Sequence, residues 1–89
     1  MNATIRVLYV EDNRRDAELT LSHFAERAPE FEIVVAGTGQ EALDQLPKEP
    51  FDLLLLDHRL PDMDGTDVLR TLLHTGWRLP VVMVTGAGS

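Results

Sequence analysis

Short apolar runs alternate along the chain with segments whose apolar residues recur at helical spacing. The four runs are rich in aliphatic and β-branched residues, which favour strands, and they cover residues 5–10, 33–36, 51–56 and 81–84. The third run has no polar residue after Asp52, a pattern typical of a strand buried on both faces. The resulting order, β-α-β-α-β-α-β, predicts an α/β fold whose right-handed crossovers build a mostly parallel sheet.

Boundary residues support the three helices between these runs. Asn13 is a candidate N-cap of the first helix, and Pro29 ends that helix. Thr38 and Glu41 have the Thr-x-x-Glu spacing of a capping box, and Gly76 is a candidate C-cap of the third helix. The predicted apolar faces comprise Ala17, Leu21, Phe24, Ala25 and Ala28 in the first helix, Ala42, Leu43 and Leu46 in the second, and Val68, Leu69, Leu72 and Leu73 in the third.

Length and composition narrow the class of protein. With 89 residues the chain forms one domain at most, and without cysteine it can form neither disulfides nor a thiolate metal site. Its net charge of -7 argues against direct nucleic-acid binding by this segment. The N-terminus lacks the apolar stretch of a signal peptide, and every apolar run is far too short to span a membrane. We therefore expect a cytoplasmic protein.

Polar residues follow three of the four predicted strands. Glu11 and Asp12 follow the first strand, Asp57 follows the third and Thr85 follows the fourth. Ligands of open parallel sheets bind beyond the carboxyl ends of the strands, so the topology can bring these side chains together. Crowded carboxylates repel one another, and a hard divalent cation relieves that repulsion. Magnesium suits such a site because it takes one or two carboxylates, keeps several waters and leaves room for phosphate oxygens.

The turn after Asp57 adds a second group of motifs. The combined pattern comprises Glu11-Asp12, the stretch 57–65 (Asp-His-Arg-Leu-Pro-Asp-Met-Asp-Gly) and Val84-Thr85-Gly86. At their mutual spacings these motifs closely resemble the response-regulator receiver family of two-component signalling, over essentially the whole chain. The resemblance implies a doubly wound, flavodoxin-like (βα)5 fold with its first four strands in the spatial order 2-1-3-4. It also implies that residues 1–89 are the N-terminal portion of one receiver domain.

The resemblance assigns roles to the matching residues. Asp57 corresponds to the phosphoacceptor, a carboxylate nucleophile that forms an acyl phosphate. Glu11 and Asp12 correspond to the magnesium-binding pair, with Asp12 the expected direct ligand. Asp57 and the backbone carbonyl of Arg59 complete the expected metal site. Thr85 corresponds to the hydroxyl that binds the phosphoryl group.

The family's chemistry also implies a cofactor and a partner. It predicts in-line transfer from a phosphohistidine, with Mg²⁺ offsetting the charge on the phosphoryl oxygens. The implied partner is a sensor histidine kinase or a phosphotransfer protein, without contact to a membrane. Such a module is not an enzyme in the ordinary sense, since it assists only its own phosphorylation and dephosphorylation.

The family pattern continues past Thr85 with a fourth helix, a fifth strand, a fifth helix and a lysine that grips the phosphoryl group. Lys48 is the only lysine in this sequence, lies before the third strand and cannot fill that role. Without those last elements, residues 81–84 would form an apolar sheet edge, and such edges pair with other chains. We therefore expect self-association through the fourth strand.

Two other functions fit parts of the pattern. The first is a receiver-like protein-interaction scaffold that is not phosphorylated in this form, which the position of Lys48 favours. The second is an aspartate-nucleophile hydrolase of the haloacid-dehalogenase type, but that family has a second Asp where this chain has Arg59. The site residues also have structural alternatives, in which Asp57 is a cap or turn acid, Glu11 a surface acid and Thr85 a turn hydroxyl.

Overall fold

Parallel strands form the centre of the structure, a computed structural model that describes residues 4–84. The strands are β1 (Ile5–Val10), β2 (Phe31–Ala36), β3 (Leu53–Asp57) and β4 (Val81–Val84). The helices are α1 (Arg14–Arg27), α2 (Gly39–Gln45) and α3 (Gly65–His74). Across the described part of the chain the sheet order is β2-β1-β3-β4, so the predicted order and the parallel pairing are confirmed.

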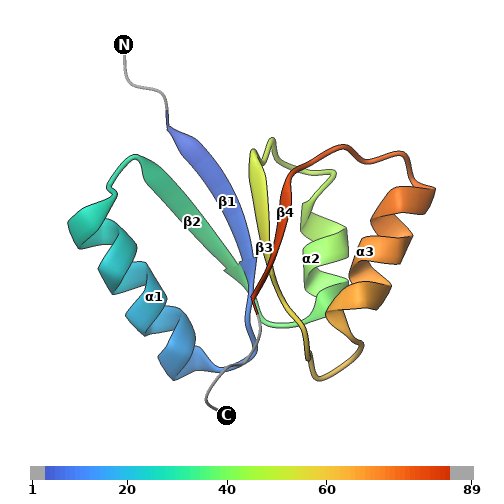
Figure 1. Cartoon of the computed structure of the whole chain (residues 1–89), viewed down its shortest axis with the longest axis horizontal. Coiled ribbons are helices and arrows are strands. Elements are labelled where there is room, and N and C mark those ends of the chain that lie inside the picture. Colours follow the sequence, from blue (N-terminus) through green and yellow to red (C-terminus); the bar gives the residue numbers. More distant parts are fainter. Residues whose placement is uncertain (1–3, 85–89) are drawn as a thin grey trace.

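The helices cover both faces of the sheet, as a doubly wound fold requires. Figure 1 shows α1 on one face and the pair α2 and α3 on the other. α1 contacts β2, whereas α2 contacts β1, β2 and α3. Because the strands are parallel, their carboxyl ends share one edge of the sheet, and the loops that lead into the helices begin there.

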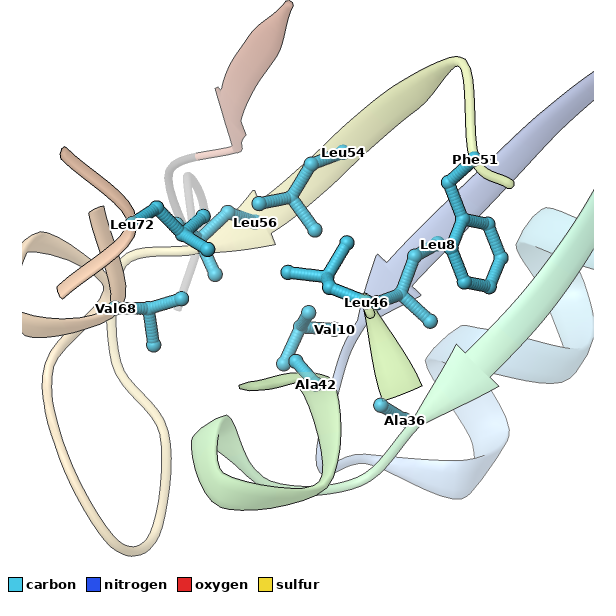
Figure 2. Packing of buried hydrophobic residues seen from close by; sticks show 10 residues of the cluster. All are labelled: Leu8, Val10, Ala36, Ala42, Leu46, Phe51, Leu54, Leu56, Val68 and Leu72. Atoms are coloured by element: carbon cyan, nitrogen blue, oxygen red, sulfur yellow. The ribbon is translucent and has the colours of Figure 1, made fainter. Parts of the chain in front are cut away.

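The main core lies between the sheet and the layer formed by α2 and α3. Leu8 and Val10 of β1, with Leu54 and Leu56 of β3, are fully buried and point toward these helices (Figure 2). Their partners in the cluster include Ala42, Leu46, Val68 and Leu72. Burial of each large aliphatic side chain contributes about 2 kcal/mol, so this cluster is the main source of stability. Trp77 is partly buried and packs against the cluster.

The face of the sheet that carries α1 is covered less completely. Val7 and Tyr9 of β1 are buried there, but Leu53 and Leu55 of β3 are only half-buried, and Val82 of β4 is 47% exposed. α1 lies against β2, and the strands farther along the sheet receive less cover from it (Figure 1). The prediction that the third strand is buried on both faces is therefore wrong within residues 4–84.

Other differences concern single positions. β2 begins at Phe31, two residues before the predicted start at residue 33. Val68 and Leu72 of α3 are buried as predicted, but Leu73 is 70% exposed because the next residue in a helix points about 100° away. Ala25, which was assigned to the apolar face of α1, is also exposed.

The predicted helix boundaries depend on specific hydrogen bonds. The side-chain oxygen of Asn13 accepts the Asp16 N–H at 3.1 Å, which confirms Asn13 as the N-cap of α1. Gly76 follows the C-cap of α3 with φ 77°, a conformation that favours glycine.

Among the helices of residues 4–84, none has the length and apolar character needed to cross a membrane.

The predicted capping box of α2 is shifted by one residue. Thr38 Oγ1 accepts the Glu41 N–H at 3.0 Å, as the Thr-x-x-Glu pattern predicts. The Glu41 carboxylate, however, accepts the N–H of Gly37 at 2.8 Å rather than that of Thr38. The first half of the capping box is therefore confirmed, and the second half involves the residue before the N-cap.

Candidate metal and phosphoryl site

The parallel register aligns two of the predicted site residues at the carboxyl edge of the sheet. Tyr9 of β1 pairs with Leu55 of β3, and Val10 pairs with Leu56. One residue further along, Glu11 comes opposite Asp57. Side chains alternate between the two faces of a strand, so Glu11 and Asp57 lie on the same face as Tyr9 and Leu55. The register between β1 and β3 thus places Glu11 and Asp57 next to each other.

Three carboxylates converge at this edge. One oxygen from each of Glu11, Asp12 and Asp57 lies within 4.8 Å of the other two, with Glu11 and Asp57 half-buried and Asp12 exposed. Hard divalent cations such as Mg²⁺ bind carboxylate oxygens. Because Asp12 is exposed to solvent, the cluster also leaves room for water and phosphate oxygens. The three residues therefore fit Mg²⁺, as the sequence predicts.

The environment of Glu11 reflects this crowding. Burial raises the pKa of Glu11, and the charge of Asp57 raises it further, while a hydrogen bond from the Asn13 N–H acts in the opposite direction. The Glu11 backbone is fixed by a bond of 2.9 Å from its N–H to the carbonyl of Ala36, which continues the β1–β2 pairing past the end of the strand. A cation at this site would lower the cost of bringing the charged acids together.

The loop from Asp57 to α3 closes on itself. Arg59 forms an isolated antiparallel bridge with Asp64, the Leu60 N–H donates to the Met63 carbonyl at 3.1 Å, and the Arg59 N–H lies 3.5 Å from Asp57 Oδ1. The side chain of Arg59 is exposed. The contribution of the Arg59 backbone carbonyl to a metal site stays a prediction. Thr85, the expected phosphoryl-binding hydroxyl, lies outside the described residues.

Gly65 brings the first turn of α3 against the end of β3. Its N–H donates to the His58 carbonyl at 2.8 Å, and a Cβ at this position would overlap the backbone carbonyl of Asp57. Only glycine therefore allows the backbone of α3 to approach β3 this closely.

Sequence reasoning missed the role of Asp62 in this loop. Its two carboxylate oxygens accept the N–H groups of Gly39 and Gln40, each at 2.9 Å, so that it bonds to the first turn of α2. The N–H of Gly39, and next that of Gln40, hold the pKa of Asp62 below its ordinary value. The partners lie 23 and 22 residues away, so no local pattern could have indicated the contact.

We expect Asp62→Asn to make folding stability depend less on pH. Because the pKa of Asp62 is depressed in the folded state, its contribution is present above the ordinary value of 3.8 and is lost as the pH falls below it. Urea unfolding over a pH series should show wild type more stable than the variant at neutral pH, with the difference shrinking in acid. Glu26→Gln, at an exposed position of α1, is the control. A difference that stays constant from neutral to acid pH would contradict the assignment.

Comparison with known proteins decides the family. The sequence model of the response regulator receiver domain matches residues 7–89. The chain belongs to the response regulator receiver domain family. The fold and the function at family level, a receiver module of two-component response regulators, were both predicted from the sequence and are confirmed.

Individual relatives agree with this family. The regulatory protein LuxO of Vibrio vulnificus is 40% identical over 80 residues, which are 90% of this chain and 17% of that protein. The receiver domain of a putative LuxO repressor protein from Vibrio parahaemolyticus superposes with a TM-score of 0.85 at 31% identity, covering 97% of this chain and 65% of that one. This receiver chain thus spans less than a fifth of the length of LuxO.

A further receiver-like structure bears on the site. The response regulator TrrA of Thermotoga maritima, solved in complex with Mg²⁺ and BeF, superposes with a TM-score of 0.84 at 26% identity. The match covers 96% of this chain and 72% of TrrA. A protein of this fold was therefore solved with Mg²⁺, and this chain has a cluster of three carboxylates that could hold a metal ion.

Proposed function

We propose that this chain is the phosphoacceptor module of a two-component phosphorelay and that Asp57 receives the phosphoryl group with Mg²⁺ as cofactor. The observation that carries the proposal is the convergence of Glu11, Asp12 and Asp57 within 4.8 Å at the carboxyl edge of the sheet. A lone aspartate at a strand end would need no such neighbours. Two further acids beside a half-buried carboxylate favour a cation site over a turn or cap role for Asp57.

The residues divide the work as follows. One oxygen of Asp57 attacks phosphorus while the P–N bond to the donor imidazole breaks, which yields an acyl phosphate and a neutral imidazole after proton uptake. Asp12 would bind the metal directly, together with Asp57 and the backbone carbonyl of Arg59. Glu11 would complete the acidic pair beside Asp12. Bound Mg²⁺ supplies positive charge to the phosphoryl oxygens. Thr85 would donate its hydroxyl to the transferred group.

Partners and location follow from the same assignment. The phosphoryl donor would be a sensor histidine kinase or a phosphotransfer protein, and the net charge of -7 supports contact with proteins rather than with nucleic acid. We also propose a cytoplasmic location, a single receiver domain of which residues 1–89 are the N-terminal portion, and no catalysis beyond the domain's own phosphorylation and dephosphorylation. The exposed Val82 and Val84 support self-association through β4, which stays a prediction.

Phosphorylation by a small donor tests the function directly. Phosphoramidate carries a P–N bond like that of phosphohistidine, so the wild-type chain is expected to gain the mass of one phosphoryl group only when Mg²⁺ is present. Asp57→Asn should gain none, because an amide oxygen is too weak a nucleophile. Asp44→Asn, at an exposed position on α2, should be labelled like wild type. Absence of labelling in the wild type would favour the interaction-scaffold alternative, and labelling of Asp57→Asn would exclude Asp57 as the acceptor.

A further inference from the structure

Tyr9, the only tyrosine of the chain, lies beside the acid cluster and contacts it through its hydroxyl. Its ring is buried, with 5% of the residue exposed, on the face of the sheet that carries α1. Its hydroxyl donates a hydrogen bond of 3.2 Å to Glu11 Oε1. Tyr9 and Glu11 are two positions apart in an extended segment and therefore project to the same side of the sheet.

The second oxygen of Glu11 is also occupied. Glu11 Oε2 accepts the N–H of Asn13 at 3.1 Å, and Asn13 is itself fixed as the N-cap of α1. A carboxylate held at both oxygens loses most of its rotational freedom. The side chain of Glu11 is therefore fixed from one direction by the start of α1 and from the other by a buried phenol.

The Tyr9 hydroxyl is suited to donate a hydrogen bond to Glu11. A buried tyrosine hydroxyl generally has a hydrogen-bond partner, and here that partner is a carboxylate of the acid cluster. A phenylalanine would fill the same space without this bond.

We propose that Tyr9 is a positioning residue of the metal site, whose hydroxyl orients the Glu11 carboxylate toward the cation. The inference rests on the proposed function, because it assigns Tyr9 a role in the Mg²⁺ affinity of that site. Outer residues that hydrogen-bond to metal-binding carboxylates often change metal affinity by about tenfold or more when they are replaced. Tyr9 acts through Glu11 and touches neither the cation nor the phosphoryl group.

Tyr9→Phe tests the role because it removes one oxygen and keeps the ring. Mg²⁺ is titrated into the full chain, with the backbone amide shifts of Asp12 and Asn13 as readout. The dissociation constant should rise about tenfold. In a Glu11→Gln background, the same Tyr9 substitution should change Mg²⁺ affinity less than twofold, since the path through the carboxylate is already removed. Phe24→Leu, a half-buried aromatic of α1, controls for loss of packing and should leave Mg²⁺ affinity unchanged.

A measurement without metal separates this inference from the proposed function. The side-chain carboxyl ¹³C shift of Glu11 in the metal-free protein should move in Tyr9→Phe and stay at its wild-type value in Phe24→Leu. An unmoved Glu11 shift, or equal Mg²⁺ weakening in both Glu11 backgrounds, would overturn the role of Tyr9. A wild-type chain that shows no response to Mg²⁺ would overturn the proposed function, and the metal-free shift would then still decide whether Tyr9 orients Glu11.

Discussion

Gly65→Ala is expected to lower the free energy of unfolding by about 3 kcal/mol and to reduce phosphorylation of Asp57. The new methyl group would overlap the backbone carbonyl of Asp57, and backbone cannot turn aside as a flexible side chain can. Relief requires α3 to move away from β3, which also strains the bond from the Gly65 N–H to His58. The substitution therefore disturbs the proposed phosphoacceptor, Asp57, as well as the fold.

Urea unfolding and phosphoramidate labelling measure the two effects of Gly65→Ala. Gly37→Ala is the matched control, because a Cβ there would meet only the Glu41 carboxylate at an ordinary distance of 3.8 Å. It should be neutral or slightly stabilising, since alanine restricts the unfolded chain. If the two variants unfolded at the same urea concentration, the proposed overlap at Gly65 would be wrong.

Leu54→Ala should destabilise the domain by about 3 to 4 kcal/mol, the usual range for a fully buried leucine. Leu54, the second residue of β3, has no exposed surface and faces the core between the sheet and the two helices. Since a domain of this size is stabilised by roughly 4 to 13 kcal/mol, the loss is a large part of the total. A truncated side chain here leaves a cavity that the surrounding sheet cannot fill.

The matched control for Leu54→Ala is Leu73→Ala. Leu73 belongs to the same residue type, lies on α3 and is 70% exposed, so its truncation should change the free energy of unfolding by about 0.5 kcal/mol or less. Chemical denaturation of the two variants provides the comparison. Similar losses at both positions would contradict the assignment of the core to the α2–α3 side.

Local patterns and the strand topology were sufficient to predict the helices, the strands and the meeting of the acidic residues. Asn13, Pro29 and Gly76 gave usable helix boundaries because capping and chain stiffness depend on neighbouring residues alone. The meeting of Glu11 with Asp57 was predictable because a parallel sheet collects the ends of its strands at one edge. Periodicity and topology thus carried the prediction as far as the acid cluster.

What the sequence did not reveal depends on contacts between distant segments. Asp62 bonds to the first turn of α2, and that contact exists only once the loop and the helix are packed together. The exposure of Leu73 depends on which of two adjacent apolar residues faces the sheet, and helical spacing alone does not separate them. The hydrogen bond from the Tyr9 hydroxyl to Glu11 was likewise not predictable, because Tyr9 belongs to an apolar run like that of any buried strand.

The same strands that build the core also end in the site, which links accurate folding to chemistry. Leu56 is buried in the core, and Asp57, the next residue, belongs to the acid cluster on the other face. A one-residue slip of β3 would exchange these sides, moving a carboxylate into the apolar core and a leucine into the site. Burial of an unpaired charge is costly enough to exclude that arrangement. The hydrophobic core thereby fixes the register of β3 and, with it, the position of the proposed nucleophile.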